Sequence, residues 1–222
     1  MSDSGVIRNI VRGVAVFPEH MPSFDPSAAP PSPVDLFLDW LRRAVDDGVA
    51  SPHAVHLATA DAEGLPDARV VILKDVTEAG WQVASSRDSP KGRQLSDTPA
   101  AALTFFWPEA GRQIRIRGAV STAGAEENHA DFQRRHPVAR ALVLAGSQST
   151  VLTSREALEE AVREQAGRIG QDDTEGLDRT AWTLFTVAPD TVEFWQADQE
   201  RKHIRLRYTR ADEAWTREIL WP

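Results

Sequence analysis

The pattern of apolar positions first shows a helical period. Ser32 and Pro33 fit the start of a helix, because serine caps helix N-termini and proline is tolerated in the first turn. Gly48 fits its end. The apolar residues between them recur at i, i+3, i+4, i+7 and i+8, and they are Phe37, Trp40, Leu41, Ala44 and Val45. This stripe predicts one amphipathic helix that ends near Gly48.

From residue 54 the pattern changes to short runs of β-branched and aromatic residues, separated by glycine-containing turns. The runs are residues 54–59, 68–75, 81–85, 100–107 and 112–121. They predict a β-meander. Residues 69–73 are nearly continuously apolar, and this indicates a strand buried on both faces.

Two helices and then further strands are predicted in the second half of the chain. The helices cover residues 125–135 and 153–169, with Thr153 and Glu156 spaced as a capping box. The later strands are residues 182–187, 192–195, 204–209 and 215–220. Strands, helices and strands again indicate an α+β fold around a mainly antiparallel sheet. Closure into a β-barrel would remove the edge strands.

Prolines spread through residues 1–31 predict a flexible N-terminal arm, which leaves one domain over residues 32–222. The net charge of −8 disfavours nucleic acid and anionic membranes as partners. The chain has no cysteine, and its histidines other than His203 show no ligand spacing. We therefore expect no metal site. Without an apolar run of about 20 residues or a signal-peptide pattern, we expect a cytoplasmic protein.

The chemistry must be sought among the basic residues, because the sequence contains no GxGxxG, Walker, HExxH or GxSxG motif. In residues 113–117 polar side chains alternate with isoleucines, so a strand would place Gln113, Arg115 and Arg117 on one face. Residues 201–207 repeat the pattern with Arg201, His203, Arg205 and Arg207. Such cations at a barrel mouth would suit a phosphate-bearing ligand. The alternative is the solvent face of a half-buried sheet, which surface statistics favour for Arg115 and Arg117.

Several segments resemble the pyridoxamine 5'-phosphate oxidase family, in order and at fitting distances over residues 34–222. Arg69-Val-Val-Ile-Leu-Lys74 resembles its flavin-binding strand, and Ser89-Pro-Lys-Gly-Arg-Gln-Leu95 its phosphate turn. Two further matches are residues 111–118 and 146–149. The most specific match is Val192-Glu-Phe-Trp-Gln196 followed by Arg201-x-His203-x-Arg205, which resembles the family's C-terminal signature.

The resemblance implies a split β-barrel that binds FMN and works as a homodimer with shared active sites. One subunit would hold FMN through Arg69, Val70, Val71, Lys74, Ser85, Lys91 and Gln113. The other would contribute Gln148, Ser149, Trp195 and Arg205. The resemblance makes Arg201 and His203 the candidate catalytic residues, lying against the substrate over the flavin ring. The substrate-binding residues would be Lys74, Arg135, Arg201 and His203, with Lys74 and Arg135 on its phosphate.

The departures from the family pattern concern mainly the substrate. Asp131 stands where the family has a tyrosine for the substrate phosphate, and Ala139 stands where it has a serine. An aspartate would repel the phosphate, and each lost hydrogen bond would weaken its binding by about 1–3 kcal/mol. Ala84 and Pro90 replace an aromatic residue and an arginine near the flavin. The flavin site is therefore expected to be mostly kept and the substrate-phosphate site to be eroded.

This pattern resembles the branch of the family that acts in phenazine biosynthesis. The resemblance implies oxidation of a reduced, dihydrophenazine-type tricyclic substrate, with O2 as electron acceptor and hydrogen peroxide as product. One alternative is a pyridoxine/pyridoxamine 5'-phosphate oxidase, which would require the changes at Asp131 and Ala139 to be compensated. The other alternative is a flavin-binding protein without catalytic activity.

Overall fold

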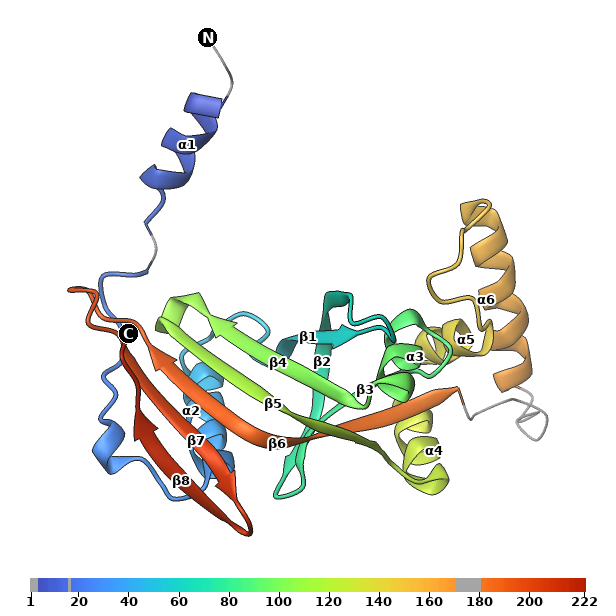
Figure 1. The fold of residues 1–222 in the computed structure, drawn as a ribbon. Helices are drawn as coiled ribbons and strands as arrows, with labels where there is room; N and C mark the ends of the chain where they lie inside the picture. The colour runs from blue at the N-terminus through green and yellow to red at the C-terminus, as the bar shows by residue number, and fades with distance from the viewer. Residues whose placement is uncertain (1–3, 16, 171–180) are drawn as a thin grey trace. The chain divides into compact units, whose positions relative to one another are not determined.

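The computed structural model describes residues 4–15, 17–170 and 181–222 (Figure 1). Its strands are β1 (Ala54–Ala60), β2 (Pro66–Thr77), β3 (Gly80–Ser86), β4 (Ala100–Trp107), β5 (Arg112–Thr122), β6 (Trp182–Gln196), β7 (Ile204–Ala211) and β8 (Ala214–Ile219). The strand order is β3-β2-β1-β4-β5-β6-β7-β8, and β3 also pairs with β6. This additional pairing closes β1 to β6 into an antiparallel barrel. The predicted α+β split barrel is confirmed.

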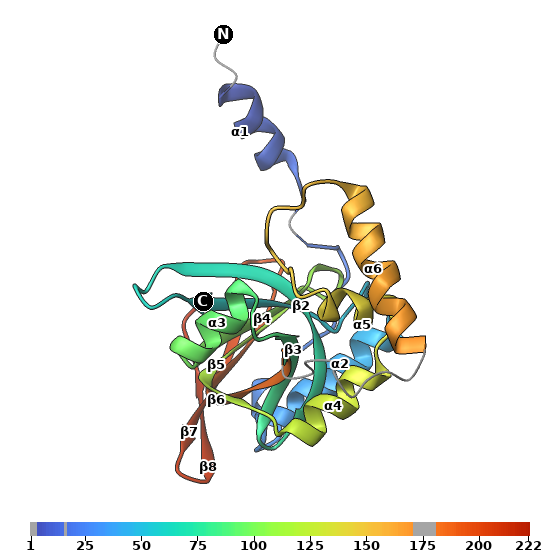
Figure 2. The same cartoon turned by 90° about the vertical axis from the view of Figure 1, so that its right-hand side faces the viewer.

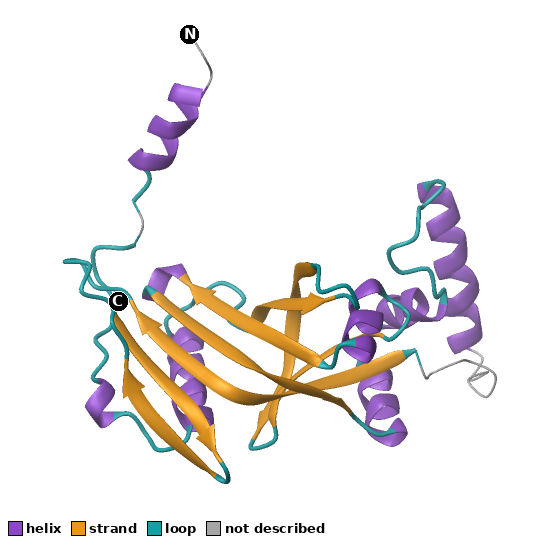
Figure 3. Cartoon of the chain, in the orientation of Figure 1, coloured by secondary structure: helices purple, strands orange, loops and turns teal. Residues whose placement is uncertain are grey.

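Helices flank the strands along the chain (Figure 3). They are α1 (Ser4–Gly13), α2 (Pro33–Asp46), α3 (Pro90–Asp97), α4 (Ala125–Arg134), α5 (Pro137–Leu144) and α6 (Arg155–Gly170), with short 3-10 turns η1 (Pro26–Ala28) and η2 (Pro108–Ala110). Figures 1 and 2 both show α5 and α6 packed together. No helix in the described ranges is both long and apolar enough to cross a membrane.

The predicted helix near residue 33 is confirmed as α2, with one correction to its buried face. Ser32 caps it through its Oγ, which accepts the Val34 N–H at 3.1 Å. Phe37 and Trp40 are buried as predicted, but Val45 is 59% exposed and Leu36 is buried in its place. Most buried residues of α2 therefore lie in its N-terminal half, where Pro33 and Val34 are also buried.

Other helices depart from the sequence prediction at their ends. α6 begins two residues later than predicted, because the Oγ of Ser154 accepts the Ala157 N–H at 3.1 Å; the predicted capping box is thus replaced by a single cap. Neither α5 nor α1 was predicted. α5 follows α4 almost directly and is short, so its apolar spacing is difficult to distinguish from the preceding helix. The predicted arm, residues 1–31, contains α1 and η1; its residues 1–3 and 16 lie outside the described residues.

The chain forms two compact units. One comprises residues 1–52, 105–115 and 192–222, and the other comprises residues 53–104 and 116–191. In the first unit, aromatic rings of α2 meet strand residues. The rings of Phe37 and Phe105 lie 5.0 Å apart between centroids, and those of Trp40 and Phe194 lie 5.2 Å apart. Tyr208 extends this core and donates its hydroxyl hydrogen to the carbonyl of Pro30 at 2.8 Å.

In the second unit, the pairing of β3 with β6 runs from Trp81 opposite Val187 to Ser86 opposite Trp182. Inward-facing side chains along it, such as Trp81, Val83 and Phe185, are fully buried. Gly80 begins β3 at φ +139°, and a Cβ there would lie 2.1 Å from the Val187 carbonyl oxygen. Only glycine allows the β2–β3 turn to approach β6 this closely.

Strand β2 corrects the prediction of a strand buried on both faces. Val70 is 56% exposed and Ile72 is 46% exposed, and they pair with His56 and Ala54 of β1. β2 therefore presents an apolar face to solvent in the single chain. The register between β2 and β3 shifts between Leu73 and Asp75, so Lys74 occupies a β-bulge.

Gly80→Ala should destabilise the barrel, because the new methyl group would collide with the backbone of β6 while the residue keeps a positive φ. We expect a loss of about 3 kcal/mol or more in the free energy of unfolding, measured by urea denaturation. Gly64→Ala is the matched control, since Gly64 also has positive φ but faces open space. A loss no larger than the roughly 1 kcal/mol expected for Gly64→Ala would contradict this role.

Candidate functional site

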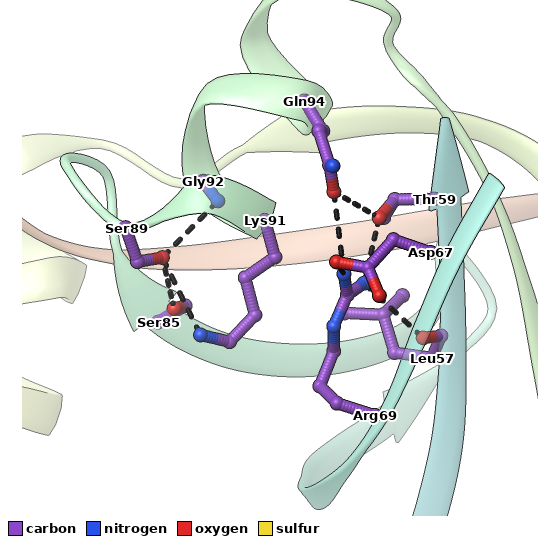
Figure 4. A network of polar contacts seen from close by, with 9 residues as sticks. All are labelled: Leu57, Thr59, Asp67, Arg69, Ser85, Ser89, Lys91, Gly92 and Gln94. Carbon is purple, nitrogen blue, oxygen red and sulfur yellow. Dashed lines mark hydrogen bonds and ion pairs between the residues drawn. The ribbon is translucent and has the colours of Figure 1, made fainter. Parts of the chain in front are cut away.

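The first cluster of polar side chains surrounds the N-terminus of α3 (Figure 4). Ser89 caps the helix: its Oγ accepts the Gly92 N–H at 3.2 Å and donates to the Ser86 carbonyl at 2.7 Å. The Ser85 hydroxyl lies 3.1 Å from the same Oγ. A Cβ on Gly92 would lie 2.3 Å from the Ser86 carbonyl oxygen, so glycine is needed for this close turn. The helix start is thereby held tightly against the end of β3.

Two cations complete this first cluster. The Lys91 ammonium lies 3.4 Å from Ser89 Oγ, and Arg69 extends from β2 nearby. Burial, and secondarily the positive charge of Arg69, lower the pKa of Lys91. Partial desolvation of a cation beside a second cation is unfavourable without an anion. With the hydroxyl of Ser85, the cluster therefore has the donors and charge to hold a phosphate group.

Arg69 is already held in position by neighbouring oxygens. Its Nη1 donates to Thr59 Oγ1 at 2.6 Å, and its Nη2 donates to Asp67 Oδ2 at 2.5 Å. Gln94 of α3 accepts a longer bond from the same guanidinium. These contacts fix the plane of the guanidinium. The Asp67 side chain is largely exposed, so its pairing with Arg69 is open to competition by a stronger anion.

The second cluster surrounds a buried carboxylate. The bulge in β2 carries Lys74, whose Nζ lies 3.3 Å from Asp131 Oδ1 of α4. The indole N–H of Trp182 donates to Asp131 Oδ2 at 2.8 Å. The Asp131 side chain is only 11% exposed. Both carboxylate oxygens are thus occupied, and the charge of Lys74 is compensated within the protein.

Arg135 contacts the face of the Trp182 ring. Its guanidinium carbon is 3.7 Å from the centroid of the indole ring, the geometry of a cation–π contact. Its Nη2 reaches the Ala139 carbonyl only at 3.5 Å. Burial lowers the pKa of Arg135, and the charge of Asp131 opposes that shift. Arg135 therefore presents a partly desolvated cation with donors still available.

A cavity of about 580 Å³ adjoins Arg135 and Trp182. Its walls come from α5, α6 and the segment between them, and most of the lining side chains are apolar. Gln148 also lines it, whereas Ser149 follows in a turn at φ +71°. Both residues are exposed in the single chain.

The predicted alternation along β5 is confirmed: Ile114 and Ile116 are buried, Arg115 and Arg117 are exposed, and Gln113 is half-buried. Sequence reasoning missed one further member of the buried face, Arg112. Its guanidinium stacks 4.1 Å from the Trp40 ring centroid, and its Nε donates to Gln196 at 2.9 Å. Burial and the nearby charge of Arg43 lower the pKa of Arg112 to about 10. Its even-numbered position, in phase with Ile114, was the available signal.

Residues 201–207 are only partly extended. β7 begins at Ile204, so Arg205 and Arg207 share a face as predicted, but Arg201 lies in a turn at φ +65°. Asp198 builds this turn, since its carboxylate accepts the N–H groups of Glu200 and Lys202. The prediction of one continuous face from Arg201 to Arg207 is therefore wrong for its first part.

His203 packs against Trp195, with ring centroids 4.8 Å apart, and Phe17 of the N-terminal segment lies 5.5 Å from the Trp195 ring. His203 Nδ1 accepts the Asp198 N–H at 3.1 Å. The neutral imidazole must therefore carry its proton on Nε2. Trp195 is half-exposed and so is not a core residue, and Phe17 was not recognised from the sequence.

Arg205, another predicted site residue of the first unit, is held by an ion pair with Glu193. The Glu193 side chain accepts from Arg205 Nε at 3.0 Å and lies 3.7 Å from Arg115. Arg205 also donates to the Trp221 carbonyl. The predicted residues thus form local groups in each unit. In the second unit, Arg69 lies near Ser85 and Lys91, and Lys74 is linked to Arg135 through Asp131 and Trp182. In the first unit, Trp195 contacts His203, and Arg205 pairs with Glu193. Val70 and Val71 lie on β2 without a polar role.

Comparison with known proteins gives consistent matches. A family model described as pyridoxamine 5'-phosphate oxidase matches residues 41–168, and one described as the pyridoxine 5'-phosphate oxidase C-terminal dimerisation region matches residues 182–222. Relatives named pyridoxine/pyridoxamine 5'-phosphate oxidase include one from Paraburkholderia phymatum, 38% identical over 87% of this chain and 91% of its own. Another, from Maricaulis maris, is 41% identical over 86% of each chain.

Two solved structures extend the comparison. PhzG from Burkholderia lata 383, in complex with tetrahydrophenazine-1-carboxylic acid, superimposes with a TM-score of 0.83 at 29% identity, covering 94% of this chain and 100% of PhzG. An FMN-binding protein related to pyridoxamine 5'-phosphate oxidase, from Nostoc punctiforme, gives 0.67 at 17% identity, covering 86% of this chain and 98% of its own. The second likeness concerns the fold alone.

The lowered pKa of Lys91 predicts pH-dependent anion binding at the first cluster. A bound dianion favours the charged ammonium, so affinity should fall as pH rises through the Lys91 pKa, by up to about tenfold per pH unit. Calorimetric titration with sulfate, which does not itself titrate in this range, measures the effect. Lys91→Arg is the control, because its guanidinium stays charged and should bind sulfate with little pH dependence. An equal slope in both proteins would assign the effect to another group.

Proposed function

Since the chain belongs to the pyridoxamine 5'-phosphate oxidase family and is an FMN-dependent oxidoreductase, we propose that it oxidises a reduced tricyclic, dihydrophenazine-type compound with O2. One observation carries the choice of substrate: Lys74, the family's substrate-phosphate lysine by resemblance, is bound to the buried carboxylate of Asp131. A phosphate monoester would have to displace that carboxylate or lie beside it. PhzG, whose structure holds a tetrahydrophenazine carboxylic acid, supports the same choice.

The donor set fits FMN. We propose that Arg69, Ser85 and Lys91 hold its phosphate, because these groups combine two cations and a hydroxyl at a helix N-terminus. Val70, Val71, Lys74 and Gln113 of the same subunit are proposed as further flavin contacts. The partner's Gln148, the partner's Ser149, the partner's Trp195 and the partner's Arg205 would complete the site.

A homodimer follows from this sharing, and two observations support it. Residues 182–222 match the family's C-terminal dimerisation region. In addition, β2 exposes Val70 and Ile72, although most apolar side chains of its neighbour strands are buried. An exposed apolar strand face is a common feature of surfaces that bind another protein.

Bound FMN supplies the acceptor for two electrons, which O2 then removes to give hydrogen peroxide. The protein's own part is to orient the substrate and stabilise charge. His203 is held by the Asp198 N–H so that its neutral ring offers an N–H donor at Nε2. Arg201, fixed in a turn next to it, offers a cation. We propose that these two groups position the substrate over the flavin and stabilise the charge that develops during the transfer.

The main alternative is a pyridoxine/pyridoxamine 5'-phosphate oxidase, which is the name of the curated relatives. It would require Lys74 to leave Asp131 when substrate binds. Mixing the FMN-loaded protein anaerobically with pyridoxine 5'-phosphate tests both proposals by flavin absorbance. We expect no bleaching with this substrate and rapid bleaching, reversed by air, with a reduced tricyclic phenazine precursor. Fast bleaching by the vitamin phosphate would establish the alternative.

A third possibility, a non-catalytic flavin carrier, predicts bound FMN that neither substrate bleaches. Two features argue against a non-catalytic carrier: the N–H donor of His203 and the nearby cation of Arg201. Retention of the flavin alone would not require them. The same titration therefore separates all three functions.

Substitution of the two C-terminal arginines should separate catalysis from cofactor binding. Arg201→Ala should lower turnover about 100-fold with FMN retained, because it removes one cation from the substrate side. Arg205→Ala should instead release FMN on dialysis, measured by the ratio of flavin to protein absorbance. Arg207→Ala, which breaks only an exposed pair with Glu218, is the control. Unchanged turnover in Arg201→Ala, or full flavin occupancy in Arg205→Ala, would contradict the respective role.

A further inference from the structure

We propose that Asp67 is an internal counter-ion of the cation cluster at α3, and that it competes with the FMN phosphate for the guanidinium of Arg69. Asp67 thereby sets how tightly the cofactor is held. The inference rests on the proposed function, which assigns the FMN phosphate to Arg69, Ser85 and Lys91. It adds a residue that this assignment does not require, a carboxylate that opposes cofactor binding.

Strand geometry brings Asp67 to the guanidinium. Asp67 and Arg69 are two residues apart on β2, so their side chains leave the strand on the same face. The Asp67 carboxylate accepts a hydrogen bond from Arg69 Nη2 at 2.5 Å, and Figure 4 shows it against the guanidinium. The alternation of β2 therefore places an anion beside a cation that is assigned to the phosphate.

The other acceptors of Arg69 are neutral groups. Its Nη1 donates to the Leu57 carbonyl at 3.3 Å and to Thr59 Oγ1 at 2.6 Å, and its Nη2 also donates to Gln94 Oε1 at 3.3 Å. The Thr59 hydroxyl in turn donates to Gln94 at 2.5 Å. These contacts orient the guanidinium without any help from Asp67.

Asp67 is the partner of Arg69 that a phosphate can replace. Among the described residues it is the only ionised group bound to this guanidinium, and its side chain is 53% exposed. An exposed ion pair contributes little stability, because water and salt screen it. A phosphate dianion carries more charge than the carboxylate and offers more acceptor oxygens to Arg69 Nη2.

The charge of Asp67 acts on the second cation as well. Burial and the charge of Arg69 lower the pKa of Lys91, and the charge of Asp67 opposes that shift. Among the nine residues of Figure 4, Arg69 and Lys91 are the cations and Asp67 is the anion. An ionised carboxylate has no hydrogen to donate, so Asp67 can only repel a phosphate bound beside these cations.

Asp67→Asn tests the competition, because it removes the charge and keeps an oxygen to which Arg69 can donate. Dissociation constants of FMN, and of riboflavin, which lacks the phosphate, are measured by titrating the flavin-free protein and following flavin fluorescence. FMN should bind the variant about fivefold or more tightly than the wild-type protein, with riboflavin affinity unchanged. An unchanged or weaker FMN affinity in folded Asp67→Asn, or an equal gain for riboflavin, would overturn the proposal.

Two further readouts distinguish competition from a change of structure. The gain in FMN affinity should shrink at about 1 M NaCl, since the screening length there is only about 3 Å. Asp67→Ala, which leaves Gln94 as the partner of Arg69 Nη2, should tighten FMN binding at least as much as Asp67→Asn. A gain that salt does not alter would contradict an electrostatic cause. Weaker FMN binding in Asp67→Ala would show instead that Asp67 serves to orient Arg69.

Asp75→Asn is the matched control. It makes the same change in net charge on the same strand, but Asp75 lies toward the other end of β2, where its carboxylate accepts the Val76 N–H. We expect wild-type FMN affinity in this variant. A gain equal to that of Asp67→Asn would assign the effect to net charge and overturn the role of Asp67.

These titrations require no turnover, so they separate this inference from the proposed oxidase function. Tighter FMN binding by Asp67→Asn, together with a flavin that no reduced tricyclic compound bleaches, would overturn the proposed function alone. Bleaching by such a compound, with equal FMN affinity in the wild-type protein and Asp67→Asn, would overturn this inference alone.

Discussion

The antiparallel pairing of β3 with β6 is the constraint on which both polar clusters of the second unit depend. It closes the barrel, and it ends with Ser85 opposite Thr183 and Ser86 opposite Trp182. Ser85 and Ser86 anchor the start of α3, while Trp182 carries the indole that contacts both Asp131 and Arg135. Backbone hydrogen bonds between two strands thus set the positions of a cation cluster and of a buried carboxylate. Because the strand backbone positions these side chains, less conformational entropy is lost when a site forms.

Much of this fold was predictable from the sequence, because strand and helix periods are local properties. The alternation around Ile114 and Ile116 predicted which side of β5 is buried, and Ser32 marked the start of α2. Local patterns failed where the burial of a residue depends on what packs against it in the fold. Val70 and Ile72 look like residues of a central strand, yet they are exposed, since hydrophobicity alone does not identify what covers a face. Arg112 is buried because it stacks on Trp40 and donates a hydrogen bond to Gln196, and both residues are distant in sequence.

The candidate site was predictable mainly in its residue types. Family resemblance indicated Arg69, Ser85 and Lys91, and the structure gathers them. It also indicated that Asp131 is an unusual neighbour for a phosphate, but not that both of its oxygens are already engaged by Lys74 and Trp182. That arrangement depends on a bulge in β2, a single extra residue that changes the direction of a side chain. No period in the sequence reveals such a residue, because it interrupts the pattern instead of continuing it.

The apolar outer face of β2 has a consequence for how the protein would behave at different concentrations. If two chains bury Val70 and Ile72 against each other, part of the free energy that stabilises each chain comes from association. By mass action, the folded population then depends on how much protein is present, and dilution acts like a mild denaturant. A newly made chain would pass through a state in which these side chains face water, so efficient assembly would matter for solubility as well as for completing the site.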